Sequence, residues 1–279
     1  MNRQEFSSLR QGLVGAWVPS LYGGGALVRE IGGVNRPATL NAGCSLTTTS
    51  GRLAIRFNGT SGKTTWGTAS LVGLSAVSVS TWSYVSLSTS ESVAIQQGGS
   101  ETSRVFFNAR ASDGNSYVGG RYPSGDFYSV TTAPSAGQWN HFVGVVITGQ
   151  STSAASRLIY INGVPASSYT HVGGASPAFP SSATFLDSGE RFTGSGTGWN
   201  DGWIDDVRIY NRVLTLSEIR LLASRRGIGL TPLPDRTAGM PRKLYVNVGG
   251  VWRSGDAYVN TGSGWRLGTP SVNVGGTFR

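Results

Sequence analysis

Residues 204–219, IDDVRIYNRVLTLSEI, decide the fold because a strand and a helix follow each other directly there. The first half is typical of a strand that offers apolar side chains to a sheet, namely Ile204, Val207, Ile209 and Tyr210. Asp205 or Asp206 is expected to accept hydrogen bonds from backbone amides at a turn. The strand therefore needs no ligand to explain it.

A helix is predicted after this strand, in TLSEIRLLASRRG. Thr215 and Glu218 have the spacing of a capping box, in which each side chain binds the backbone amide of the other residue. Gly227 marks the end of the helix. Beyond the cap, the sequence gives an apolar stripe of Leu216, Ile219, Leu222 and Ala223.

Short alternating segments precede this stretch. The segment GLVGAWVP is predicted to be an opening strand that stops at Pro19, and RLAIRF a second strand that runs into the turn NGTSG. WNHFVGVVI and SRLIYINGVP are predicted to form a hairpin with its turn at Asn162-Gly163. In AVSVSTWSYVSL, one face takes Val77, Val79 and Thr81, and the other takes Ser78, Ser80, Trp82 and Tyr84.

The composition agrees with a chain of short strands and tight turns. Hydrophobic residues make up 38% of the 279 residues and charged residues 13%, with 41 glycines. Cys44 is the only cysteine, so no disulfide is expected within the chain. The start lacks the apolar segment of a signal peptide, and no apolar run of about 18 residues occurs, so no membrane partner is expected.

Many short strands and one helix near their end indicate a two-sheet sandwich. The order of GLVGAW, RLAIRFNGTSG, GQWNHFVGVV, RLIYINGVP and GWIDDVRIYNRVLTLSEIRLL resembles the laminin-G-like, concanavalin-A-type jelly-roll family over residues 12–224. The resemblance implies two antiparallel sheets and a domain that binds glycans or proteins. We therefore expect an all-β fold, a two-sheet antiparallel jelly-roll sandwich with one short helix near its end and a small C-terminal β-hairpin repeat segment.

Four segments are predicted. Residues 1–11 form an N-terminal arm, 12–226 the sandwich, 227–242 a proline-containing linker, and 243–279 three 13-residue β-repeats. The repeat is visible in the even spacing of Asn247, Asn260 and Asn273, and in that of Trp252, Trp265 and Phe278.

The repeats are interpreted as an attachment device. Each unit has the pattern of a small hairpin, and three such units are too small to bury a core alone. Aromatic and arginine side chains are the composition of an interaction hot spot. The predicted attachment residues are Trp252, Arg253, Trp265, Arg266 and Phe278. The alternative is a satellite hairpin packed on the chain's own sandwich.

The formal charge of +9 is concentrated at the end of the chain. From Arg220 onward there are nine Lys and Arg residues, against Asp235 and Asp256. This segment is expected to be drawn to acidic surfaces, unless its charges only solubilise exposed strands. No nucleic-acid partner is expected, since no recognised binding motif accompanies the charge.

No enzymatic activity is expected. Related glycoside hydrolases use two facing carboxylates, and Asp205 and Asp206, being adjacent on a strand, should point to opposite faces. His141, His171 and Cys44 have no recognisable catalytic context.

No metal or other cofactor is expected either. The resemblance implies a calcium loop in some relatives, but the matching loop here, residues 58–63, carries a lysine and no carboxylate.

A glycan site is predicted in the loop GSGTGWNDGW, where rings for stacking and polar groups lie together: Trp199, Asn200, Asp201 and Trp203. A second interpretation stays open. Trp203 would then begin the next strand and belong to the core, while Trp199 covers the edge of the sandwich.

The YVNVGG-x-W units are similar to repeats at the ends of tailed-phage virion proteins, which implies a virion structural protein. We expect it on the surface of the particle. The function predicted is a non-enzymatic capsid decoration or head fibre, with capsid protein as its partner and a jelly roll that displays a glycan site. The alternatives are a tail-fibre or receptor-binding adhesin and a free carbohydrate-binding lectin. Monomer and homo-oligomer both stay open.

Overall fold

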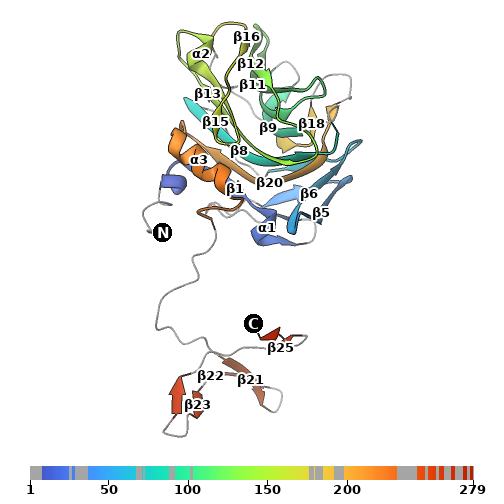
Figure 1. The fold of residues 1–279 in the computed structure, drawn as a ribbon, viewed down its shortest axis with the longest axis vertical. Coiled ribbons are helices and arrows are strands. Elements are labelled where there is room, and N and C mark those ends of the chain that lie inside the picture. The colour runs from blue at the N-terminus through green and yellow to red at the C-terminus, as the bar shows by residue number, and fades with distance from the viewer. Residues whose placement is uncertain are drawn as a thin grey trace. The chain divides into compact units, whose positions relative to one another are not determined.

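The computed structural model describes residues 8–24, 27–28, 37–66, 71, 73–87, 92–100, 103–175, 179, 185–191 and 198–230, and the tail strands 244–248, 251–255, 258–260, 265–267, 273–274 and 277–278. The chain divides into two compact units, Met1–Thr231 and Pro232–Arg279 (Figure 1).

The first unit contains two antiparallel sheets. Among the described residues, sheet A has eight strands: β15 (Val164–Pro165), β14 (Arg157–Ile161), β13 (Trp139–Ile147), β8 (Ala76–Val85), β20 (Asp201–Tyr210), β6 (Arg52–Asn58) and β5 (Cys44–Thr49) in spatial order, with β1 (Leu13–Trp17) paired to β20.

Sheet B lies opposite sheet A. Its ten strands, counted over the described ranges, are β16 (Thr170–Val172), β12 (Gly125–Thr132), β11 (Asn115–Tyr122), β10 (Ser103–Arg110), β9 (Ser92–Ser100), β17 (Phe185–Ser188), β7 (Thr64–Thr65), β4 (Ala38–Leu40), β3 (Leu27–Val28) and β2 (Gly23–Gly24). A separate ladder pairs β18 (Glu190–Arg191) with β19 (Gly198–Trp199).

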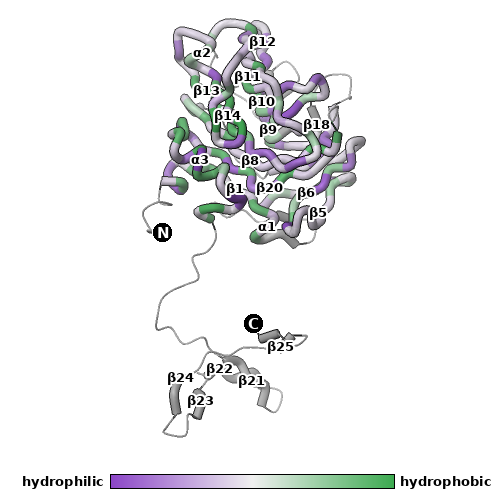
Figure 2. The backbone as a smooth tube through the Cα atoms, viewed as in Figure 1, coloured by the Kyte–Doolittle hydropathy of each residue, from purple (hydrophilic) through white to green (hydrophobic). Residues whose placement is uncertain are grey.

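The main core fills the space between the sheets. Figure 2 shows that hydrophobic residues, from which the core is built, occur as short patches along many strands. Alternation along β8 sends Val77 and Val79 into this core, where Trp17 and Trp66 pack with ring centroids 5.3 Å apart. The predicted fold class, an all-β antiparallel sandwich of the jelly-roll kind, is confirmed.

Helix α3 (Leu216–Ser224) covers part of the outer face of sheet A (Figure 1). Its capping box is present as predicted, with the Glu218 amide 3.3 Å from Thr215 Oγ1 and the Thr215 amide 2.9 Å from a Glu218 carboxylate oxygen. Ile219 and Leu222 are buried against β13, whereas Leu216 is 36% exposed. The predicted apolar stripe is therefore narrower than the sequence indicated.

The prediction of one short helix is incomplete. The described residues also contain a 3-10 helix, η1 (Ser8–Arg10), and two four-residue helices, α1 (Pro19–Tyr22) and α2 (Ser153–Ser156). Helices this short span about one turn, so they show no 3.6-residue hydrophobic period for the sequence to reveal.

The predicted hairpin is right in its strands and wrong in its turn. Strand β13 pairs with β14, but α2 lies in the segment between them. Asn162-Gly163, with φ of 51° and 79°, instead joins β14 to β15. The two left-handed residues make the tight turn that the dipeptide favours, one strand later than predicted.

Described residues near both ends of the first unit are buried. Leu9, in the predicted arm 1–11, is fully buried. Ile228 and Leu230, in the segment predicted as linker 227–242, are 6% and 3% exposed. These residues belong to the hydrophobic clusters on the outer side of sheet A.

The second unit contains three two-stranded hairpins among its described residues: β21 (Leu244–Val248) with β22 (Val251–Gly255), β23 (Tyr258–Asn260) with β24 (Trp265–Leu267), and β25 (Asn273–Val274) with β26 (Thr277–Phe278). The register repeats with the sequence, since the same Asn-to-aromatic pair occurs in each hairpin: Asn247 with Trp252, Asn260 with Trp265, and Asn273 with Phe278.

Candidate functional site

A groove of about 260 Å³ lies on the outer face of sheet B. Strand β10 supplies one wall by simple alternation, because Val105 and Phe107 are buried in the core while Phe106 points the other way. The sheet B groove is lined by Arg104, Phe106, Asn108, Tyr117, Arg121, Asp126 and Tyr128.

The register of the strands creates the hollow. Phe106 lies opposite Gly119 of β11, and Gly119 lies opposite Tyr128 of β12. Gly119 has a φ of +152°, and a Cβ at this position would lie 2.2 Å from the carbonyl oxygen of Phe127. Only glycine fits here, so no side chain stands between Phe106 and Tyr128 in this row.

Three rings form the apolar part of the groove. The centroids of Phe106 and Tyr128 are 6.4 Å apart, and those of Tyr117 and Tyr128 are 5.6 Å apart. The Tyr117 hydroxyl donates a hydrogen bond to Asp113, and burial together with this bond raises the pKa of Tyr117 to about 12. The ring therefore remains a neutral phenol, suited to stacking.

One end of the groove is charged. Arg104, Arg121 and Asp126 lie side by side on neighbouring strands, in register. Arg121 binds Asp126 through two hydrogen bonds of 2.8 and 3.0 Å. Such a fork holds the guanidinium and the carboxylate in a fixed plane.

The other end of the groove has a hydrogen-bond acceptor. Asn108, opposite Tyr117, is 3% exposed, and its Oδ1 has no hydrogen-bond partner among the described residues. An unsatisfied buried acceptor costs about 1–3 kcal/mol, which a donor on a ligand would recover.

The groove continues past Tyr117. A second hollow of about 280 Å³ shares this ring and is lined by Asn115, Tyr117, Val130, Thr131, Thr132, Ser168, Tyr169 and Thr170. Together the two hollows give room for more than one sugar ring.

The glycan site predicted in a loop falls instead on two strands, because Trp199 is in β19 and Asp201 and Trp203 are in β20. Trp199 is half-buried on β19, where it pairs with Glu190, and Asn200 is 2% exposed. Asp201 lies near Trp203 on the outer face of sheet A, because Arg56 binds Asp201 at 2.8 Å and stacks over Trp203 at 4.6 Å.

Trp203 has structural partners on sheet A. Its indole donates to Thr47 at 2.8 Å, and its ring meets Tyr84 edge-on at 5.2 Å. Because Arg56 also covers the ring, Trp203 serves as a cross-strand packing residue. The second interpretation placed Trp203 in the core. The structure places it on the outer face of sheet A instead.

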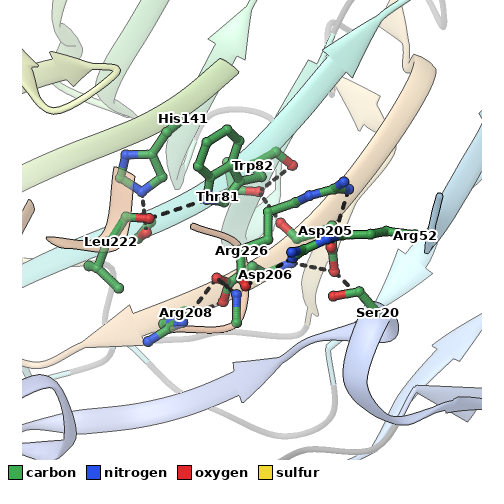
Figure 3. Close-up of polar contacts among 12 residues, drawn as sticks. Ser20, Arg52, Thr81, Trp82, His141, Asp205, Asp206, Arg208, Leu222 and Arg226 are labelled. Carbon is green, nitrogen blue, oxygen red and sulfur yellow. Dashed lines mark hydrogen bonds and ion pairs between the residues drawn. The ribbon is translucent and has the colours of Figure 1, made fainter. Parts of the chain in front are cut away.

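The expectation that Asp205 and Asp206 point to opposite faces is wrong. Asp206 has a φ of 51°, and the register of β20 shifts between Asp205 and Arg208. This bulge turns both carboxylates into one polar cluster (Figure 3), where Asp205 lies 3.5 Å from Arg226 and Asp206 accepts from the Gly227 amide at 2.6 Å. As predicted, these aspartates accept backbone amides.

The same cluster contains a serine next to a histidine. Ser80 Oγ lies 2.9 Å from His141 Nε2, and each residue is 1% exposed (Figure 3 labels His141). Burial lowers the pKa of His141 to about 3. The pair lies within the fold, where a substrate does not reach the hydroxyl.

The loop 58–63 binds its own backbone. Asn58 Oδ1 accepts the amides of Thr60, Ser61 and Gly62, and Lys63 forms a 2.8 Å ion pair with the buried Asp187. Among the described residues, no group of three or more His, Cys, Asp or Glu side chains is placed to hold a metal ion. That the protein uses no calcium and no cofactor stays a prediction.

The predicted attachment residues fall on the second strand of each hairpin, with Trp252 and Arg253 on β22, Trp265 and Arg266 on β24, and Phe278 on β26. Their side chains lie outside the described part of the chain. In the described part, no helix is both long and apolar enough to span a membrane.

A sequence model of the family described as the concanavalin A-like lectin/glucanases superfamily, Laminin G 3, matches residues 58–220. The chain belongs to this superfamily. Membership agrees with the jelly-roll resemblance predicted from the sequence. The superfamily's description covers both lectins and glucanases, so membership alone does not separate binding from catalysis. No curated protein sequence matches the chain.

Several solved structures have a fold similar to this sandwich. A Trypanosoma rangeli sialidase in complex with sialic acid has a TM-score of 0.52 and 18% identity, over 76% of this chain and 32% of the sialidase. The receptor binding domain of a botulinum neurotoxin C/D mosaic serotype has a TM-score of 0.55 and 13% identity, over 76% and 51%.

A third similar structure is domain 4 of AbnA, a GH43 extracellular arabinanase from Geobacillus stearothermophilus, in complex with arabinotriose. Its TM-score is 0.53 and its identity 19%, over 76% of this chain and 98% of that domain. At these identities the likeness shows the fold alone, and this chain spans about a third of the length of the sialidases.

Sequence reasoning missed the groove. The signal was present in SRVFFNAR, NSYVGGRY and GDFYSV, where alternation leaves aromatic and charged residues on the non-core face of three successive strands. The pairing of the strands, which aligns those residues into one patch, was not readable from the sequence.

Proposed function

We propose that the sandwich is a non-enzymatic glycan-binding module whose ligand lies in the sheet B groove. The observation that carries the proposal is the row Phe106–Gly119–Tyr128, where two rings pack beside each other in the groove, with hydrogen-bonding groups at both ends. Sugars are recognised by flat rings that stack on C–H faces and by a few fixed polar groups. The superfamily's lectin members and the arabinotriose-bound relative support it.

The charged groups in the groove favour glycan binding without hydrolysis of the glycan. Glycoside hydrolysis uses two carboxylates about 5–9.5 Å apart across the scissile bond. Among the described residues that line the groove, Asp126 is the only carboxylate, and Arg121 holds both of its oxygens.

A binding assay with matched variants tests this proposal. We expect the full chain to bind a member of an immobilised glycan panel, and Phe106→Ala to weaken that binding by about tenfold or more, roughly 1.4 kcal/mol. Trp199→Ala removes a ring elsewhere and should leave the affinity unchanged. If Trp199→Ala abolishes binding while Phe106→Ala does not, the site is at β19 and the start of β20. Turnover of any bound glycan would overturn the non-enzymatic role.

For the whole chain we propose a virion surface protein, a capsid decoration or head fibre that its hairpin tail anchors to capsid protein. The support is the shared register of the three hairpins, which presents an aromatic residue and an arginine at the same place in Trp252-Arg253 and Trp265-Arg266. A tail-fibre adhesin and a free lectin are the alternatives.

Removal of the tail separates these alternatives. A chain that ends at Thr231 keeps the buried Leu230 and should fold, but it should not be incorporated into particles. Mass spectrometry of purified particles, with copies counted against the major capsid protein, measures incorporation. Normal incorporation of the truncated chain would contradict anchoring by the tail, and absence of the full chain from particles would favour the free lectin.

A further inference from the structure

We infer that the sheet B groove selects an anionic glycan, one that carries a carboxylate or a sulfate, and that Arg104 holds the acidic group. This inference rests on the glycan-binding function proposed above and specifies the chemistry of its ligand. It starts from the charged end of the groove.

Arg104 and Arg121 face each other across β10 and β11. Asp126, on the next strand, is bound in two places by Arg121. Among the described residues that line the groove, two carry a guanidinium group and one carries a carboxylate.

The Arg104 side chain is held in position by its neighbours. It is 5% exposed, its guanidinium carbon lies 5.6 Å from the centroid of the Phe106 ring, and Gln96 accepts from it at 3.5 Å. A guanidinium held in position next to a stacking ring loses little freedom when it binds, and its planar donors match a carboxylate or a sulfate.

The position of the charge relative to the rings fixes the arrangement of the ligand. A sugar ring stacked on the packed pair of Phe106 and Tyr128 has Arg104 and Arg121 one row away along the strands and Asn108 one row away on the other side. An acidic substituent at one edge of the sugar therefore meets the arginines, and a hydroxyl at the opposite edge meets the unsatisfied Asn108 oxygen.

Matched acidic and neutral ligands test the inference on the full chain. The pairs are sialyllactose and sulfolactose against lactose, and trigalacturonate against its methyl ester. We expect the acidic member of at least one pair to bind about tenfold more tightly, as a charge-assisted contact implies. This preference should shrink between about 50 and 500 mM salt, because added salt screens the charge of Arg121, whose side chain is 41% exposed, and that of the ligand before it is bound.

Two substitutions locate the effect. Arg104→Gln should weaken the binding of the acidic member of a pair by more than that of the neutral member, and Arg104→Lys should recover only part of this difference because the ammonium lacks the planar fork. Arg56→Gln, on the outer face of sheet A, is the control and should keep the preference. If Arg104→Gln fails to fold, Arg121→Gln takes its place, and the salt dependence of the unmodified chain is independent of both.

The outcomes separate the two proposals. Equal affinity for acidic and neutral members, with binding still lost in Phe106→Ala, overturns the anionic preference and keeps the glycan-binding function. An acidic preference that survives both arginine substitutions overturns the role of these residues. No binding of any carbohydrate, acidic or neutral, overturns both proposals.

Discussion

The backbone amide of Gly227 donates a 2.6 Å hydrogen bond to Asp206 and so joins the segment after α3 to the centre of sheet A. Asp206 also holds Arg208 through bonds of 2.6 and 2.9 Å, and both side chains are almost fully buried. The bulge at Asp206 therefore connects the last part of the sandwich to a buried ion pair.

Asp206→Ala should strongly destabilise the sandwich. The change leaves the Arg208 guanidinium buried without its carboxylate, which costs about 3–5 kcal/mol. Urea unfolding, followed by tryptophan fluorescence, measures the loss. Asp126→Ala breaks the Arg121 ion pair, where the side chains are 41% and 35% exposed, and should cost less than about 1 kcal/mol. Equal costs for the two variants would show that burial of the pair does not matter.

The stability of the sandwich should depend on pH through His141. Burial lowers its pKa from 6.5 to about 3, so the unfolded chain takes up a proton first and stability is lost as the pH falls from 6.5 toward 3. Asp205 acts in the opposite sense, because burial and the charge of Asp206 raise its pKa to about 6. Its contribution grows as the pH falls from 6 toward 3.8, so the two groups nearly cancel over that range.

His141→Gln removes one of these opposing groups. In that variant the Asp205 contribution remains, and the melting temperature should rise as the pH falls from about 6 to 4 instead of staying level. Scanning calorimetry at several pH values measures this difference. An unchanged pH profile would mean that His141 does not titrate at a lowered pKa in the folded protein.

Gly119→Ala should destabilise the fold and narrow the groove. The new Cβ would meet the Phe127 carbonyl oxygen, and the φ of +152° is strained for alanine, so the cost should exceed about 2 kcal/mol. Gly125→Ala is the matched control, because its φ is +132° but nothing lies within 4 Å of the new Cβ. If both variants lose the same stability, the close approach of β12 at Gly119 is not what demands glycine.

Longer glycans should bind more tightly than single sugars. The second hollow shares the Tyr117 ring with the groove, so a trisaccharide gains contacts that its terminal sugar lacks. Calorimetric titration with a mono- and a trisaccharide of the same sugar measures this gain. Tyr117→Ala should remove it, whereas equal affinities for both lengths would confine the site to the first hollow.

The elements that the sequence predicted well are those with local signals. The strand and helix of residues 204–219 and the capping box of Thr215 and Glu218 depend on neighbouring residues, and the structure has both. The turn at Asn162-Gly163 was assigned to the wrong strands because a dipeptide gives the type of turn but not which strands it joins.

The elements that were missed depend on long-range pairing. The bulge at Asp206 arises where β20 meets β8, and the groove arises where β10, β11 and β12 come into register. Outward-facing residues such as Arg121 and Tyr128 are indistinguishable in the sequence from ordinary solvent-exposed positions. The glycan site was predicted at residues 199–203 because these residues are close together in the sequence. The groove residues come from three strands, so the sequence does not show that they lie together.

The most direct test of the central claim is a crystal structure of the full chain soaked with the tightest glycan from the binding panel. We expect a sugar ring stacked on the packed rings of Phe106 and Tyr128, with an acidic group at Arg104 and a hydroxyl at Asn108. A glycan stacked on Trp199 or Trp203, with the sheet B groove empty, would contradict the account.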